Sequence, residues 1–314
     1  MSGYKKNNNK AIFEFMDALF IGHNYTDVTF VTDYIPTGDE KYVGDDYAFG
    51  VGGNAVVAAF TCAKFGLDAG LITQVADDRL GDIFLQRAAR HGIRIFPRTV
   101  NKSSLSLILP NGGDKRAILR CRDTDYLTKP HQVRLKNVDA IHVDGHMPRV
   151  ALDVLKKARD KGILTSLDGG ADRPLIDDIL EYIDIAVMSE DFSKQKKMTE
   201  EETFEFLKGK GVKVAAITYG SKGVNVYEFE TGNQYHIGSV PVPLEKIVDT
   251  TGAGDVFHGS YLYSYIENPE KPWVEHFKFA RCASALCIQR MGAEPGIPLL
   301  TEVQELYAET ADLP

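Results

Sequence analysis

Short apolar segments alternate with helical segments over the second half of the chain, and this alternation constrains the fold most strongly. A strand at Ala140–Val143, a helix over Pro148–Asp160 that ends at Gly162, and a strand at Ile163–Leu167 form one βαβ unit. A second unit follows, with a strand at Ile185–Met188, a helix at Glu200–Leu207 and a strand at Val214–Thr218. Repeated βαβ units predict an α/β fold with a doubly wound, mostly parallel sheet and helices on both faces.

The remaining segments extend this body. An apolar run at Ala18–Gly22 predicts a first buried strand, and the polar stretch HNYTD follows it. Val224–Glu228 and Gln234–Gly238 read as a hairpin, because Thr231–Asn233 supplies turn residues between them. Two helical segments follow, at Val256–Glu267 and Val274–Arg290. We expect one domain over residues 1–314, since no linker rich in Pro, Gly or Ser interrupts the pattern.

Three segments alternate apolar and polar residues and predict a small separate β-layer. They are Val28–Tyr47, Ser104–Leu109 and Arg116–Cys121, with a turn at Asn111–Gly113. Alternation also puts Arg120 and Arg122 on one face of the last strand, where they could meet an anionic group.

Composition excludes several functions. Lys and Arg number 36 against 44 Asp and Glu, a net charge of −8, so neither nucleic acid nor an anionic membrane surface is an expected partner. No run of about 18 apolar residues is present, and we expect a cytoplasmic protein. Four cysteines without CxxC spacing, Cys62, Cys121, Cys282 and Cys287, predict core filling and neither a zinc site nor disulfides.

The stretch VDTTGAGDVFHG, residues 248–259, is the most informative motif. Its glycines let backbone N–H groups converge at the start of a helix, where the helix dipole favours an anion. Asp255, just inside that helix, could accept a proton from an attacking hydroxyl group while the amides hold a phosphoryl group. A base beside an anion site is the arrangement that phosphoryl transfer needs.

This motif resembles the C-terminal signature of the PfkB/ribokinase-type carbohydrate kinases, and Gly52–Gly66, GGNAVVAAFTCAKFG, resembles their N-terminal signature. The two motifs agree in order and spacing with that family from about residue 18 to residue 298. The resemblance implies a ribokinase-like fold with a small β-sheet lid, formed here by about residues 28–50 and 103–122. It also implies ATP-dependent phosphorylation of a sugar, Mg²⁺ bound with ATP, and pairing of lids in a homodimer.

The resemblance assigns roles on the phosphate side. Asp255 becomes the catalytic base, and the amides of Gly252, Ala253 and Gly254 become the anion hole. The family's other matching positions are Thr218, Gly220 and Gly223 near the nucleotide, Gly292 and Ala293 beside the adenine, and Asp249 and Thr251 as ligands of a monovalent cation such as K⁺.

On the acceptor side, Asp27 matches the carboxylate that holds sugar hydroxyls, and Gly52, Gly53 and Asn54 match the double-glycine turn beneath the sugar. Asp168 at a strand end matches a further polar position. The histidines His142, His146 and His258 receive no role.

The chain departs from the family pattern at three places. Val57 stands where the family usually has an Asn, four residues after the second glycine. Ser189–Phe192 replaces the Asn-x-x-Glu that organises Mg²⁺, and Ala76 replaces a glycine before Asp77 and Asp78. Ketohexokinase-like and sulfofructose-kinase-like members relax the second motif too, and this favours a ketose such as fructose as acceptor.

Several alternatives stay open. Ribose, a sugar phosphate, sulfofructose or a nucleoside could be the acceptor of the same fold. Gly50–Ala55 fits G-x-G-x-x-A, which would suit an NAD-dependent oxidoreductase, but that reading leaves VDTTGAGD unexplained. A sugar or nucleotide sensor without catalysis would not need the base Asp255.

Overall fold

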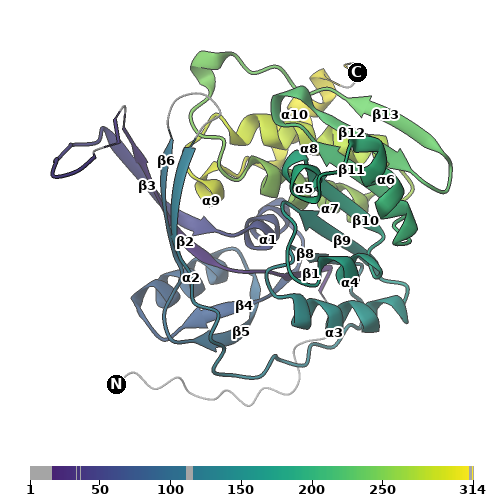
Figure 1. Cartoon of the computed structure of the whole chain (residues 1–314), viewed down its shortest axis with the longest axis horizontal. Helices are drawn as coiled ribbons and strands as arrows, with labels where there is room; N and C mark the ends of the chain where they lie inside the picture. The colour runs from purple at the N-terminus through teal and green to yellow at the C-terminus, as the bar shows by residue number, and fades with distance from the viewer. Residues whose placement is uncertain (1–15, 33, 36, 111–115, 311–312, 314) are drawn as a thin grey trace.

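The computed structural model describes residues 16–32, 34–35, 37–110, 116–310 and 313, and two sheets organise it (Figure 1). Within these residues, the large sheet has the strand order β13-β12-β11-β10-β9-β8-β1-β4-β5. Its strands are β1 (Ala18–Ile21), β4 (Ala69–Ala76), β5 (Arg94–Val100), β8 (Ala140–Val143), β9 (Leu164–Gly169), β10 (Ile185–Ser189), β11 (Val214–Thr218), β12 (Val224–Glu228) and β13 (Asn233–Ile237). The predicted α/β fold is confirmed.

Parallel pairing brings the carboxyl ends of the strands to one edge of this sheet. All pairs from β11 to β5 are parallel, and only β12 and β13 are antiparallel, as the predicted hairpin. The chain leaves β1 toward β4 and β5 on one side and later returns to β8 on the other. The crevice beside β1 and β8 is therefore a switch point, where ligands bind in open α/β sheets.

Helices cover both faces of the large sheet because its strands bury side chains in both directions. Ile185 and Val187 of β10 join one core, while Ala186 and Met188 join the other. One face carries α1 (Asn54–Phe65), α2 (Arg79–Arg90), α7 (Ala253–Glu267), α8 (Trp273–Cys287) and α10 (Leu300–Glu309). The other carries α3 (Pro148–Arg159), α4 (Ile176–Leu180), α5 (Glu190–Lys196) and α6 (Glu200–Gly209).

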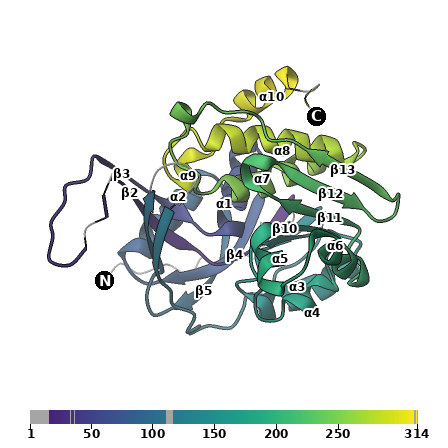
Figure 2. The ribbon, with the colours of Figure 1, turned by 45° about the horizontal axis from the view of Figure 1, so that its top comes forward.

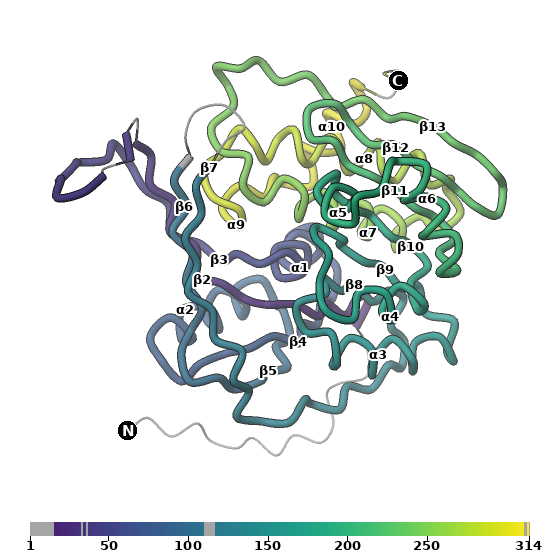
Figure 3. Tube along the Cα trace, viewed as in Figure 1, coloured from purple at the N-terminus to yellow at the C-terminus, as the bar shows by residue number. Residues whose placement is uncertain are grey.

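The predicted small β-layer exists as a separate lid sheet with the order β3-β2-β6-β7, which stands to one side of the body (Figures 1 and 3). Its strands are β2 (Tyr25–Val31), β3 (Asp46–Gly52), β6 (Leu105–Pro110) and β7 (Arg116–Cys121). The predicted turn at Asn111–Gly113 lies outside the described residues. Figure 2 shows that β2 and β3 extend away from the body into a long loop.

The two faces of the lid sheet differ in chemistry. Register places Asp27, Ser106 and Arg120 in one row on neighbouring strands, so these polar side chains share a face. The opposite face carries apolar residues that include Val28, Phe30, Tyr47, Leu107 and Leu119. Leu119 is 69% exposed and Tyr47 is 66% exposed, so the apolar face is open to solvent.

Three of the four cysteines fill the core as expected, but Cys121 is exposed on β7. Its strand lies at the edge of the lid sheet, and Cys121 shares the solvent-exposed face with Leu119, two residues earlier. In the part of the chain that the structure describes, no helix is both long enough and apolar enough to cross a bilayer.

Buried histidines make the fold sensitive to acid. Burial lowers the pKa of His23, His142 and His146 to about 3 and that of His276 to about 4. These groups are neutral in the folded state but become protonated in the unfolded chain below about pH 6.5, the ordinary pKa of histidine. Protons therefore favour unfolding, by up to about 1.4 kcal/mol per pH unit for each histidine.

We expect the free energy of unfolding to fall by a few kcal/mol from pH 7 to pH 5, measured by urea denaturation. Burial raises the pKa of Asp144 to about 6, so this carboxyl group takes up a proton in the folded state over the same pH range. Its effect on the unfolding free energy has the opposite sign and is about as large as that of one histidine. His276→Asn should reduce the slope. An unfolding free energy that stays constant over this range would show that the buried histidines do not have lowered pKa values in the folded state.

Candidate active site

The GAGD motif forms the start of α7 at the carboxyl edge of the large sheet. Gly252 caps the helix with φ +83°, and Asp255 lies half-buried in the first turn. A Cβ atom on Gly252 would lie 2.7 Å from Cα and Cβ of Ala293, so only glycine allows this close approach. The first amides of a helix lack intrahelical acceptors and can bind an anion.

The buried carboxylate of Asp249 joins this turn to the loop around Gly292. Its Oδ1 accepts the Thr251 N–H at 2.8 Å, and its Oδ2 accepts the Gly292 N–H at 2.9 Å. The structure thus brings the predicted cation residues and the predicted adenine loop together. Thr251 Oγ1 is buried and has no hydrogen-bond partner among the described residues. That hydroxyl oxygen is therefore a candidate ligand atom.

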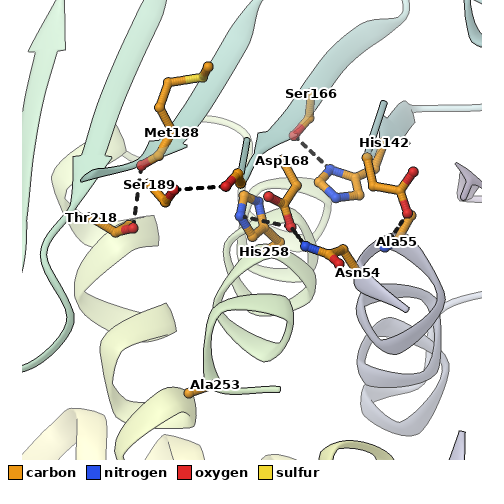
Figure 4. Close-up of polar contacts among 12 residues, drawn as sticks. Asn54, Ala55, His142, Ser166, Asp168, Met188, Ser189, Thr218, Ala253 and His258 are labelled. Carbon is orange, nitrogen blue, oxygen red and sulfur yellow. Dashed lines mark hydrogen bonds and ion pairs between the residues drawn. The ribbon is translucent and has the colours of Figure 1, made fainter. Parts of the chain in front are cut away.

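The predicted nucleotide loop lies at the end of β11. Thr218 Oγ1 donates to the Met188 carbonyl at 3.3 Å, and a short 3₁₀ turn spans Gly220–Lys222 (Figure 4). Gly223 closes the turn with φ +94°, and its carbonyl accepts the Tyr219 N–H at 2.8 Å.

The predicted acceptor residues meet where β2 and β3 leave the body. Asp27 is 7% exposed, and a Cβ atom on Gly52 would lie 1.9 Å from Asp27 Oδ2. The absence of a side chain at Gly52 therefore makes room for the carboxylate. Gly53, with φ +107°, caps α1, and a Cβ atom there would lie 2.0 Å from the His23 carbonyl oxygen.

Asn54 begins α1 and reaches across to the end of β9. Its Nδ2 donates to Asp168 Oδ2 at 2.8 Å, and His258 Nε2 of α7 lies 3.5 Å from the same oxygen (Figure 4). His258 was assigned no role from the sequence, although a histidine within an otherwise apolar helical segment indicates that its ring makes polar contacts. The structure places His258 on α7, one turn after Asp255, with its ring beside the Asp168 carboxylate that also binds Asn54.

The polar face of the lid sheet adds groups near the acceptor residues. The Arg120 guanidinium lies 4.9 Å from the centre of the Tyr25 ring. Burial, with Arg122 and Arg120 nearby, lowers the pKa of His23 to about 3, so both guanidinium groups act on this part of the site. Ser106, which the sequence analysis missed, is fully buried in the same row, and its Oγ has no partner among the described residues.

The departure at Ser189–Phe192 has a structural explanation. Phe192 is fully buried in the core, so α5 directs no carboxylate from that position toward the site. Glu190 pairs with Lys194 at 2.9 Å, and Ser189 Oγ donates to the Gly170 carbonyl at 3.0 Å. No group of three or more His, Cys, Asp or Glu side chains that could hold a metal occurs in the described ranges.

The position of Gly50–Ala55 argues against dinucleotide binding. This segment follows β3, an antiparallel strand of the lid sheet, whereas the fingerprint requires the first parallel strand of the large sheet. The G-x-G-x-x-A match therefore lacks its structural context.

The chain is similar to known sugar kinases in sequence and in fold. The ribokinase of Lactococcus lactis subsp. lactis (strain IL1403) is 24% identical over 304 residues, which cover 92% of this chain and 96% of that protein. Fructokinase-2 of Oryza sativa subsp. japonica is 25% identical over 295 residues, which cover 83% and 86%. The structure of Arabidopsis thaliana ribokinase complexed with ribose and ATP has a TM-score of 0.78 and 22% identity, and covers 93% of this chain and 99% of that one.

A family model also matches most of the sequence. The model of the pfkB family carbohydrate kinases covers residues 17–300, which include both glycine motifs and every predicted site residue. The chain therefore belongs to the pfkB family of carbohydrate kinases.

Proposed function

We propose that this kinase transfers the γ-phosphate of ATP to a primary hydroxyl group of a sugar, with Asp255 as the base. The observation that carries the proposal is the first turn of α7, where the Asp255 carboxylate directly follows the Gly252–Gly254 turn. Amides at this helix end would stabilise the charge that develops on the phosphoryl oxygens. Asp255 would take the proton of the attacking hydroxyl group.

The nucleotide would lie between the loops at Gly220–Gly223 and Gly292–Ala293. Asp249 supports this assignment, because its two hydrogen bonds fix the second loop against the start of α7. A phosphate chain that reaches the first amides of α7 would then continue past that loop.

Mg²⁺ would be held by the ATP phosphates and water, since Phe192 removes the usual carboxylate from α5. Bound there, it would neutralise phosphate charge. Asp249 and the unpartnered Thr251 hydroxyl are the residues of this chain that fit a monovalent cation such as K⁺, because such ions take oxygen ligands.

The acceptor would lie over Gly52 and Gly53, with its hydroxyl groups bound by Asp27, Asn54 and the unpartnered Ser106 hydroxyl. We propose a ketose such as fructose as the acceptor, a choice that the similarity to a fructokinase supports. Ribose is the second candidate, and more of the similar relatives are ribokinases than fructokinases.

Arg120 and Arg122 would bind the end of the acceptor that lies opposite the reacting hydroxyl group. The row that joins Arg120 to Asp27 through Ser106 supports this, because it turns the guanidinium toward the acceptor side. An acceptor with a phosphate or sulfonate group would gain most from the two guanidinium groups.

The apolar face of the lid sheet supports pairing of two chains through their lids. Leu119 and Tyr47 are both more than 60% exposed there, and burying them against a second copy would remove apolar surface from water.

A test of the base uses the wild-type protein with Mg·ATP and a panel of fructose, ribose, tagatose, fructose phosphates, sulfofructose, adenosine and inosine. We expect strong ADP release with one acceptor. With that acceptor, Asp255→Asn should lower kcat by about 10²- to 10⁴-fold while the Kd for ATP stays within twofold, because only the proton acceptor is lost. Near-normal kcat in this variant would exclude Asp255 as the base.

A test of the acceptor site is Gly52→Ala, whose methyl group would displace the Asp27 carboxylate. We expect the KM for the sugar to rise about tenfold or more, the scale of a lost hydrogen bond to a charged group, with the KM for ATP unchanged. Gly209→Ala is the matched control, because a Cβ atom at Gly209 meets nothing within 4 Å. Equal sugar KM values for both variants would refute the role of Asp27.

A further inference from the structure

A chain of buried polar contacts runs beneath the acceptor residues and ends inside the core. It starts at Asn54, whose Nδ2 donates to Asp168, and continues to His258 on α7 (Figure 4). Asp168 and His258 are each no more than 5% exposed. A carboxylate that is buried from water needs polar partners, and Asn54 and His258 supply them to Asp168.

The series of polar contacts continues on the other side of the His258 ring. Its Nδ1 lies 3.2 Å from the Tyr261 hydroxyl, which lies 2.6 Å from Ser166 Oγ. Ser166 Oγ lies 2.9 Å from His142 Nδ1 on the neighbouring strand. Ser166 and Asp168 are two residues apart on β9, so they share the face that packs on α7.

The donors and acceptors in this series of contacts fit one set of hydrogen-bond directions. Burial raises the pKa of Asp168, but His258 and the Asn54 hydrogen bond outweigh it, and the carboxyl group is ionised. Burial lowers the pKa of His258, so its ring is neutral near pH 7. Since a carboxylate only accepts, the single ring proton of His258 belongs on Nε2.

The rest of the order follows from that proton. His258 Nδ1 must accept from Tyr261, Tyr261 must accept from Ser166, and Ser166 must accept from His142 Nδ1–H. His142 Nε2 is then the bare nitrogen, and it is buried without a hydrogen-bond partner in the described part of the chain. Burying an unprotonated ring nitrogen without a partner costs less free energy than burying an N–H group without an acceptor would.

We propose that His258 is a positioning residue that orients the Asn54 amide for the acceptor through Asp168. With Nδ2 of Asn54 turned to Asp168, its Oδ1 is the atom left to accept a hydroxyl proton from the sugar. His258 lies one turn after Asp255 on α7, so the same helix would hold both the base and the acceptor contact. This inference rests on the proposed function.

Two substitutions of His258 separate positioning from packing. The amide nitrogen of Gln reaches the position of Nε2, whereas the amide of Asn reaches only the position of Nδ1. We expect His258→Asn to raise the KM for the sugar about tenfold or more and His258→Gln to keep it within threefold, with the KM for ATP unchanged in both. His276→Asn is the control, because it alters a buried histidine bonded to Ser264 at 2.9 Å and should change neither KM.

A spectroscopic measurement tests the proton position without activity. In protein labelled with ¹⁵N-histidine, the signal that disappears in His258→Gln should show the Nε2–H form at pH 7.5, and the Nδ1–H form would overturn the assignment. Equal sugar KM values for the Asn and Gln variants, with an active wild type, overturn the positioning role alone. A wild type that is inactive on every acceptor overturns the proposed function and this inference with it.

Discussion

Parallel pairing of strands is the constraint on which the rest of this structure depends. It places the ends of β8, β9, β10 and β11 along one edge, so the residues that follow them converge although they are far apart in sequence. Asp144, Asp168, Ser189 and Thr218 all lie there. The helix α7 begins at the same edge, because its His258 lies beside Asp168 at the end of β9 and its Tyr261, further along the helix, lies beside Ser166.

Strong local patterns made much of the fold predictable from the sequence. Ala140–Val143, Val214–Thr218 and Val224–Glu228 have the predicted bounds, because each is a short apolar or alternating run between polar turns. Two strands escaped prediction. Ala69–Ala76 is buried throughout and shows no period of two, and Arg94–Val100 contains Pro97, which is typical of the edge position that it occupies.

The local geometry of the candidate site was predictable where neighbouring residues of one motif determine it. Gly252 and Asp255 are three positions apart in sequence, and their relative geometry follows from the start of a helix. The contacts of Asn54 with Asp168 and of Asp168 with His258 join residues about 90 to 114 positions apart, so they depend on the sheet order, which residue patterns alone do not specify. The position of Ser106 beside Asp27 likewise depends on the register of the lid strands, which the sequence does not specify.

The central claim is that Asp255 accepts the proton of a sugar hydroxyl beside a phosphate bound at the start of α7. A crystal structure with Mg²⁺, a non-hydrolysable ATP analogue and the best acceptor tests it most directly. We expect the Asp255 carboxylate to lie about 2.6–3.2 Å from the acceptor hydroxyl, which should point in line at the γ-phosphate, with the first α7 amides on the phosphate oxygens. A sugar hydroxyl bound to a different base, or phosphates bound away from α7, would contradict the account.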